Sequence, residues 1–161
     1  MSVSGAQRYW HEAPAGVELA PLAIDVTATT VVLGAMATRD YAPMHHDRAY
    51  ATGRSGTRDI FLNTPNQAAF FERYLTDWSG PRGRLGRMRF RMKESVCPGD
   101  TLTITGRVQQ AEVDTAGCGW VQLALSMTVA GKLMTECEAR LALPLEATDN
   151  PWRRRGAEWL P

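Results

Sequence analysis

The second half of the chain alternates apolar and polar residues over long stretches, and this alternation constrains the fold more than any other feature. Side chains two residues apart lie on the same face of a strand, so such alternation indicates strands with one buried and one exposed face. Turn sequences separate the stretches, and the last of these, Ala130-Gly131, is typical of a two-residue hairpin. We therefore predict four antiparallel strands, which include Arg87 to Lys93, Leu102 to Val108, Val121 to Val129 and Leu133 to Leu143.

The clearest helix of the chain precedes these strands. Asn63 or Thr64 is suited to cap its first turn, and Pro65 lies where a helix tolerates proline. Apolar residues then recur at spacings of three and four, which places them on one helical face: Ala68, Phe71, Leu75 and Trp78. The sequence Ser79-Gly80-Pro81 ends the helix.

The order of elements predicts an α+β fold. A weak strand from Leu22 to Thr27 and a short helix capped by Thr27 or Thr29 come first. The long helix and the four strands follow, and a sheet wrapped around that central helix buries the apolar faces of both. We expect one domain over residues 17–145, with an N-terminal extension, 1–16, and a C-terminal tail, 146–161, which is laid over the domain or a partner.

Bulk composition excludes several classes of protein. The chain has 161 residues and a net charge of +1, which gives no general attraction to nucleic acid or acidic membranes. Its three cysteines show no Cys-x-x-Cys spacing, so neither a disulfide framework nor a zinc knuckle is indicated. The chain lacks an apolar signal core and a membrane-length apolar run. We expect a cytoplasmic protein that binds neither nucleic acid nor membrane.

Asp40 and His45 place a carboxylate and an imidazole five residues apart, with Pro43 between them. Proline fixes its own φ and disfavours helix at Ala42, so the link is predicted to be an ordered loop. Near neutral pH a free carboxylic acid is ionised and a free imidazole is mostly uncharged. Both groups then accept a proton from one water molecule, and the spacing predicts an acid/base pair.

The same residues also have structural and metal-binding interpretations. Asp40 would cap a short helix that begins near His46, and His45 would be a hydrogen-bonded histidine of the core. Alternatively, His45, His46 and Asp47 would bind a metal, but adjacent histidines rarely converge on one ion without further ligands. Asp47 is better suited to cap a helix or to support the pair. We expect no metal site.

The chain resembles the MaoC-like (R)-specific enoyl-CoA hydratase/dehydratase family of hotdog-fold proteins. The resemblance covers about Gly16 to Leu143 and is strongest in two segments, Asp40-Tyr-Ala-Pro-Met-His45 with Ala51 six residues on, and Val96-Cys-Pro-Gly-Asp-Thr-Leu102. The family motif is Asp-x-Asn-Pro-hydrophobic-His, and Ala42 stands where the Asn is common. The family's Gly-Gly-x-Ile-Ala-His-Gly segment is replaced by the residues from Gly56 to Asn63.

This resemblance implies reversible syn addition of water to a trans-2-enoyl-CoA, giving a 3-hydroxyacyl-CoA. Asp40 and His45 would activate the water and return a proton to C2. Backbone N–H groups at the start of the central helix would hold the thioester oxygen, and we place that donor at Leu62, Asn63 or Thr64. The resemblance implies no cofactor, since CoA is part of the substrate. It also implies pairing of two hotdog domains edge to edge, as a homodimer or with a related chain.

Two groups of basic residues have alternative interpretations. Arg87, Arg89 and Arg91, with Arg82 and Arg84 before them, would either bind the phosphates of CoA or form a solvated strand face. The tail sequence from Trp152 to Arg155 is typical of solvated charge, although a patch for nucleic acid or membrane has the same composition.

Two other functions remain open at this stage. A hotdog thioesterase would need a carboxylate near the central helix, where Glu72 is expected to lie deep rather than at the mouth. A non-catalytic hotdog subunit would not need an intact Asp40 and His45.

The segments Asp59 to Pro65 and Arg73 to Trp78 resemble family members that act on bulky acyl groups, including steroid side-chain CoA thioesters. Small residues there would leave room for an acyl group, and aromatic residues would offer flat apolar surface. Alternatively, Ala68 and Ala69 serve only to let the helix pack closely against the sheet. The residues concerned are Gly53, Gly56, Phe61, Ala68, Ala69, Phe70 and Phe71.

Overall fold

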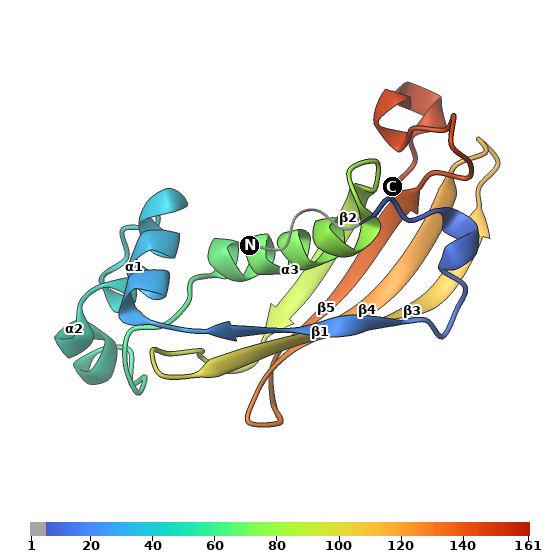
Figure 1. Ribbon diagram of the computed structural model, residues 1–161. Helices are drawn as coiled ribbons and strands as arrows, with labels where there is room; N and C mark the ends of the chain where they lie inside the picture. Colours follow the sequence, from blue (N-terminus) through green and yellow to red (C-terminus); the bar gives the residue numbers. More distant parts are fainter. Residues whose placement is uncertain (1–5) are drawn as a thin grey trace.

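The computed structural model describes residues 6–161 and forms one antiparallel sheet with a helix across one face (Figure 1). The strand order is β1-β3-β4-β5-β2, so β1 and β2 are the edges. The strands are β1 (Glu18–Asp25), β2 (Arg84–Met92), β3 (Thr101–Val113), β4 (Gly119–Val129) and β5 (Lys132–Leu143). All four strands predicted for the second half are present, and the predicted α+β arrangement of a sheet against one central helix is observed.

The central helix α3 (Thr64–Ser79) begins where its cap predicts. The Asn63 side chain accepts a hydrogen bond from the Asn66 backbone N–H, so Asn63 and not Thr64 is the N-cap. Phe71 and Leu75 are fully buried against the inward side chains of the sheet, among them Ile104, Leu123 and Leu141. This shared core fixes the helix across the sheet.

The tight turn Ala130-Gly131 joins β4 to β5 as predicted. Its φ angles are 48° and 79°, the left-handed conformation that a two-residue hairpin with the correct twist requires. Strand β1 extends from Glu18 to Asp25, so it begins four residues before the predicted Leu22. Pairing with β3, from Glu18 opposite Arg107 to Asp25 opposite Thr101, orders this stretch, in which alternation is weak.

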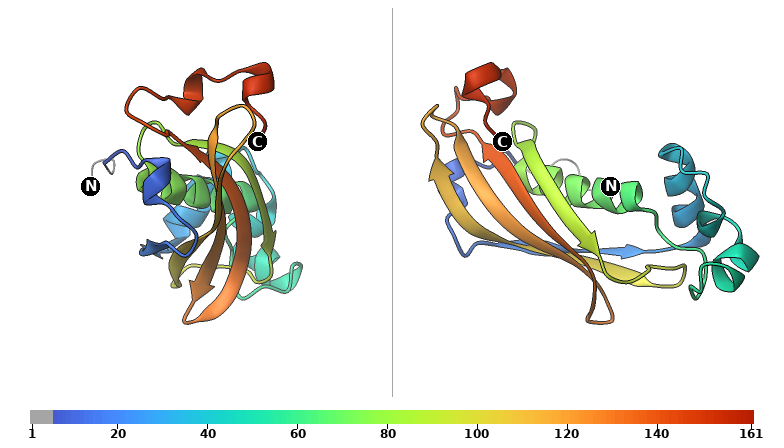
Figure 2. Two further views of the ribbon diagram at one scale, coloured as in Figure 1. Left: turned by 90° about the vertical axis from the view of Figure 1, so that its right-hand side faces the viewer. Right: turned by 180° about the vertical axis from the view of Figure 1, so that it is seen from behind.

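Two short helices form a lobe beyond one end of the sheet (Figures 1 and 2). They are α1 (Ala28–Ala37), capped by Thr27, and α2 (Arg48–Gly53), capped by Asp47. Asp47 Oδ1 accepts a hydrogen bond of 3.0 Å from the Tyr50 N–H, as expected for a cap. The interpretation of Asp40 as the cap of this helix is therefore wrong.

Gly34 allows α1 to approach α3 closely. A Cβ atom at Gly34 would lie 1.9 Å from Nδ2 of Asn66, which is far inside van der Waals contact. A side chain there would require the Asn66 side chain to shift or the helices to move apart. Gly34 therefore leaves room for the Asn66 side chain between the end of α1, where Asp40 follows, and the start of α3.

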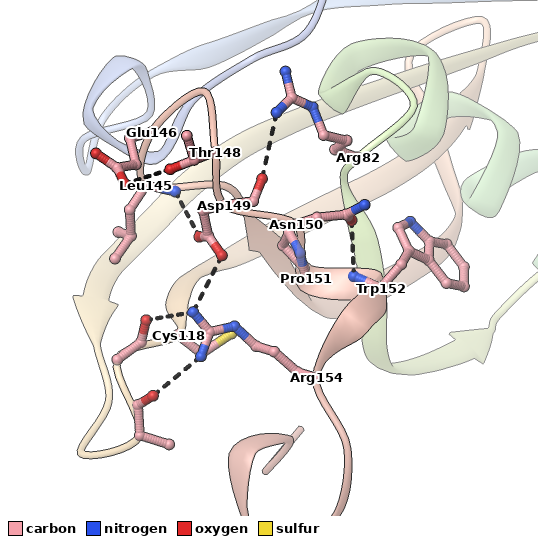
Figure 3. A network of polar contacts seen from close by, with 12 residues as sticks. Arg82, Cys118, Leu145, Glu146, Thr148, Asp149, Asn150, Pro151, Trp152 and Arg154 are labelled. Atoms are coloured by element: carbon pink, nitrogen blue, oxygen red, sulfur yellow. Dashed lines mark hydrogen bonds and ion pairs between the residues drawn. The ribbon is translucent and has the colours of Figure 1, made fainter.

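The C-terminal tail lies at the opposite end of the sheet from this lobe (Figures 1 and 2). Trp159 packs on Trp120 of β4 with ring centroids 4.7 Å apart, and this covers the face of the sheet that points away from α3. Figure 3 shows the guanidinium of Arg154 between Asp149 and two carbonyl groups, those of Ala116 and Gly117, of the β3–β4 turn. The tail thus covers its own domain.

The expectation of solvated charge in the tail is wrong for Arg154, whose side chain is 17% exposed, although Arg153 and Arg155 are exposed. Within residues 6–161, no helix is long and apolar enough to cross a membrane.

Candidate active site

The end of helix α1 positions Asp40. The Arg39 N–H bonds to the Met36 carbonyl at 3.1 Å, and the Asp40 N–H bonds to the Ala35 carbonyl at 2.9 Å. This is the Schellman pattern, which needs a left-handed residue after the cap, and here Arg39 adopts φ 56°. The usual residue at such a position is glycine. The predicted helix runs through Met36 with the loop directly after it, and α1 ends at Ala37 as that prediction requires. Because Arg39 gives no glycine signal, only the turn type is not apparent from the sequence.

Three groups surround the carboxylate of Asp40. Its Oδ1 accepts the Ala42 N–H at 3.3 Å, and its Oδ2 accepts a bond of 3.0 Å from the side-chain amide of Asn63. The Asn63 amide is the largest cause of a lowered Asp40 pKa; partial burial opposes it, while Ala42 and the nearby His45 act in the same direction. The side chain keeps 29% exposure, so solvent and substrate can reach it.

His45 lies in a short 3-10 turn, Pro43–His45, and its side chain is only 7% exposed. Its Nδ1 lies 2.8 Å from the Phe61 carbonyl oxygen. A carbonyl only accepts, so Nδ1 must carry the hydrogen, and in the neutral ring Nε2 is then an acceptor. Nε2 lies 3.4 Å from Asp40 Oδ2. The structure therefore brings the two predicted residues together as neighbouring proton acceptors.

The three residues predicted to hold the thioester oxygen differ in their backbone bonding. The Leu62 N–H is occupied, because it donates to the Val96 carbonyl at 2.9 Å. Within the described part of the chain, the N–H groups of Asn63 and Thr64 have no hydrogen-bond acceptor. Both lie at the start of α3, where the helix dipole favours negative charge.

The structure does not bring the arginine row to this site. Arg87, Arg89 and Arg91 are exposed on β2 and alternate with Met88 and Phe90, which pack toward the core. They therefore lie on the face of the sheet away from α3. Across the sheet Arg89 pairs with Glu138 of β5 and Arg91 with Glu136, which offsets part of the positive charge.

Two further arginines bind the tail. Arg82 donates to the Ala147 carbonyl and Arg84 to the carbonyls of Pro151 and Arg154, and the Arg84 guanidinium lies 3.6 Å from the centre of the Trp159 ring. These contacts give Arg82 and Arg84 a structural role in holding the tail.

Glu72 is exposed on α3, so the expectation that it lies deep is wrong. Its position in the helix turns it away from the core formed by Phe71 and Leu75. Across residues 6–161, no three His, Cys, Asp or Glu side chains gather as a metal site would require.

A family model described as "FAS1-like, dehydratase domain region" matches residues 13–132. The chain belongs to this family. A curated relative from Mycobacterium tuberculosis, the 3-oxo-4,17-pregnadiene-20-carboxyl-CoA hydratase beta subunit, is 36% identical over 93 residues, which cover 58% of this chain and 71% of the relative. The predicted MaoC-like, hydratase-type membership is thereby confirmed.

Two solved structures are similar across nearly their whole length. A chain of the ChsH1-ChsH2 complex from Mycobacterium tuberculosis has a TM-score of 0.72 and 26% identity, with 80% of this chain and 97% of that chain covered. A MaoC-like dehydratase from Rhodospirillum rubrum has a TM-score of 0.74 at 16% identity, with 84% and 96% covered, and this likeness shows the fold alone.

Proposed function

We propose that the protein is an enoyl-CoA hydratase that adds water reversibly to a trans-2-enoyl-CoA to give a 3-hydroxyacyl-CoA. The observation that supports this most directly is the 3.4 Å separation of Asp40 Oδ2 and His45 Nε2. Both atoms are acceptors when the carboxylate is ionised and the ring is neutral, so neither can donate to the other. A water molecule at hydrogen-bond distance from both would donate one hydrogen to each.

The reaction follows from that arrangement. As the water oxygen attacks C3, one of the two acceptors takes a proton from the water, and the C=C electron pair shifts toward C2 and the thioester carbonyl. The enolate oxygen gains negative charge and is held by the N–H groups of Asn63 and Thr64. A proton from the Asp40 and His45 pair then bonds to C2 on the same face, which restores the pair. Positioned acid/base groups supply about 10²- to 10⁴-fold in rate, and oxyanion stabilisation supplies a further part.

The substrate class rests on the relatives. One is a subunit of a hydratase for a steroid side-chain CoA thioester, and we propose that this protein also acts on a bulky acyl group. Phe61 supports the proposal, because it lies edge-on to the His45 ring with centroids 4.9 Å apart and is partly exposed. Phe71 does not contribute, since it is fully buried beside Phe90.

The acyl preference is measured directly. We expect kcat/KM for a branched or polycyclic enoyl-CoA to exceed that for crotonyl-CoA by about tenfold, which corresponds to about 1.4 kcal/mol of transition-state binding. A preference for the four-carbon substrate would reject a bulky acyl group and leave the hydratase assignment intact.

We propose a second hotdog chain as the partner, identical or related. Strand β2 is an edge with free backbone hydrogen-bonding groups on one side, and pairing with the same edge of another sheet would satisfy them. The relatives fit this, because one is a beta subunit and another belongs to a two-chain complex. Sedimentation at assay concentration tests it, and an active monomer would count against pairing.

A role of Arg87, Arg89 and Arg91 in CoA binding depends on such a partner. In the single chain they lie away from the site, but they line the edge where a second subunit would place its own groups. We propose that they attract the CoA phosphates there. The variant Arg89→Ala should raise KM for an enoyl-CoA and leave KM for the matching N-acetylcysteamine thioester, which has no phosphates, unchanged.

One assay separates the three candidate functions. Loss of the conjugated enoyl absorbance with crotonyl-CoA or a bulkier enoyl-CoA indicates a hydratase, release of free thiol indicates a thioesterase, and neither signal indicates a non-catalytic subunit. We assign the reaction to the cytoplasm, because Cys97, Cys118 and Cys137 are all free thiols.

A further inference from the structure

Asn63 links the acid/base pair to the central helix. It is 1% exposed, and its side chain makes three hydrogen bonds. Its Oδ1 accepts the Asn66 N–H at 3.2 Å, while its Nδ2 donates to Thr38 Oγ1 at 2.8 Å and to Asp40 Oδ2 at 3.0 Å. The backbone N–H requires the amide oxygen and the carboxylate requires the amide nitrogen, so the orientation of the amide is fixed.

We propose that Asn63 is a positioning residue for the hydration reaction, which holds the Asp40 carboxylate beside His45 and ties that carboxylate to the start of α3. The inference rests on the proposed function. The residue stands in the segment where this chain departs from the common family sequence, and it is also the cap of α3. A cap alone requires only the amide oxygen, and the bond from Nδ2 to Asp40 lies outside that requirement.

The geometry shows what this bond does. Asn63 holds Oδ2, which is the oxygen of Asp40 that lies 3.4 Å from His45 Nε2. The other oxygen, Oδ1, has only the longer bond from the Ala42 N–H, at 3.3 Å. Without the amide, the carboxylate could rotate, and the two proton acceptors would no longer share one water molecule. A hydrogen bond to the ionised form also favours ionisation, so the same contact keeps Asp40 charged.

Few other charged groups face Asp40. Helix α1 contributes none, because Ala28–Ala37 contains no charged residue, and the first turn of α3 contributes none either. His45 is the titratable neighbour within the turn Pro43–His45, and Arg39 and His46 are exposed. A change in the titration of Asp40 after substitution of Asn63 therefore reports on the amide itself, provided that His45 is unchanged.

The substitution Asn63→Ser removes the side-chain amide and keeps both the helix cap and the backbone N–H. Serine caps helices about as well as asparagine, and the backbone N–H proposed to hold the enolate is retained. Asn63→Asp also keeps the cap and the shape, but it places a second carboxylate beside Asp40. Asn66→Ser is the matched control, because it removes a buried amide from the same turn that donates to the Thr30 carbonyl and not to Asp40.

The test combines a substrate-free measurement with kinetics. The ¹³C signal of the Asp40 carboxyl, assigned by its absence in Asp40→Asn, is followed against pH in protein labelled at aspartate. We expect the pKa of Asp40 to rise in Asn63→Ser and to rise further in Asn63→Asp, with no change in Asn66→Ser. We expect kcat to fall about 10- to 100-fold in Asn63→Ser with KM nearly unchanged. If Asn63→Ser does not fold, Asn63→Asp supplies both measurements.

The outcomes separate this inference from the proposed function. If the wild-type protein is active, an Asn63→Ser variant with unchanged kcat overturns the positioning role, whether or not the carboxyl titration moves. An unchanged titration also overturns it. If the wild-type protein hydrates no enoyl-CoA although the titration shifts as expected, the proposed function is wrong, while the hold of Asn63 on Asp40 stands.

Discussion

Asp40 and Asp114 lie at opposite ends of the sheet, and both carboxylates are held by N–H donors. At Asp114 both oxygens are bonded: Oδ1 accepts the N–H groups of Ala116 and Cys118 at 2.9 and 2.8 Å, and Oδ2 accepts the Trp120 indole N–H at 2.8 Å. At Asp40 the bonds are fewer and longer, and one oxygen faces a histidine. Asp114 is held by N–H donors alone, whereas Oδ2 of Asp40 also lies beside the imidazole Nε2 of His45.

This difference distinguishes a carboxylate that holds a turn from one that we propose to act in catalysis. The pKa of each is below its ordinary value, so ionisation alone does not distinguish them. At Asp114 burial opposes ionisation, and the bonds from Cys118, Trp120 and Ala116 outweigh it. These donors cannot take up a proton, and they fix the β3–β4 turn on which the C-terminal tail rests (Figure 3). At Asp40, the free capacity of the carboxylate and the nearby Nε2 are what acid/base chemistry requires.

The largest effect is expected from the acid/base pair. Asp40→Asn and His45→Gln should each lower kcat for enoyl-CoA hydration by about 10²- to 10⁴-fold, because each removes one of the two proton acceptors. Unfolding in urea should show a free energy close to that of the wild type. If both purified variants keep near wild-type turnover, the proposed chemistry is wrong.

At Asp114 we expect a loss of stability without a loss of activity. Asp114→Ala should lower the free energy of unfolding by about 2–3 kcal/mol, because it leaves buried N–H groups without a charged acceptor, and kcat should not change. Because its pKa is lowered in the folded protein, the Asp114 carboxylate stabilises the fold at pH values above its ordinary pKa of 3.8. This contribution disappears as the pH falls through the lower pKa of the folded state.

Urea unfolding of the wild type and of Asp114→Ala across pH 2–7 checks this pH dependence. The stability gap should close at the acidic end. A gap that stays constant with pH would mean that the charge of Asp114 does not stabilise the turn.

A smaller effect is expected where the two helices of the site meet. Gly34→Ala should lower the free energy of unfolding by about 1–2 kcal/mol, since overpacking against Asn66 exceeds the gain in helix propensity. It should also lower kcat, because a shift of Asn66 or of α1 would disturb the start of α3, where Asn66 donates to the Asn63 side chain. Gly53→Ala in α2 is the control, since no atom lies within 4 Å of the Cβ it would add. Equal stability of the two variants would contradict the close approach.

The smallest effect is a gain in stability. Arg39→Gly should raise the free energy of unfolding by about 0.5–1 kcal/mol, because a side chain disfavours the left-handed φ of 56° at this position. Arg39→Ala keeps the Cβ and should show no gain, which separates backbone strain from loss of charge. If alanine stabilises as much as glycine, the Schellman turn is not strained.

Most of the fold could be predicted from local patterns. Alternation gave the strands after residue 84, the cap Asn63 gave the start of α3, and Ala130-Gly131 gave a hairpin. The left-handed turn that ends α1 could not be predicted, because an arginine occupies the position where glycine is usual. The start of β1 was also missed, since long-range pairing with β3 orders it and its own pattern is weak.

At the site, the sequence by itself determined that Asp40 and His45 lie close together, because Pro43 and a short loop join them. Only the tertiary structure decided the rest. The Phe61 carbonyl that sets the tautomer of His45, the Asn63 amide that holds Asp40, and the bond that occupies the Leu62 N–H all come from one segment that follows α2. Hydrogen bonds between separate segments form only where the fold brings donor and acceptor within about 3 Å of each other. Tertiary packing sets those distances, as it does between Gly34 and Asn66. Local sequence patterns do not encode this packing.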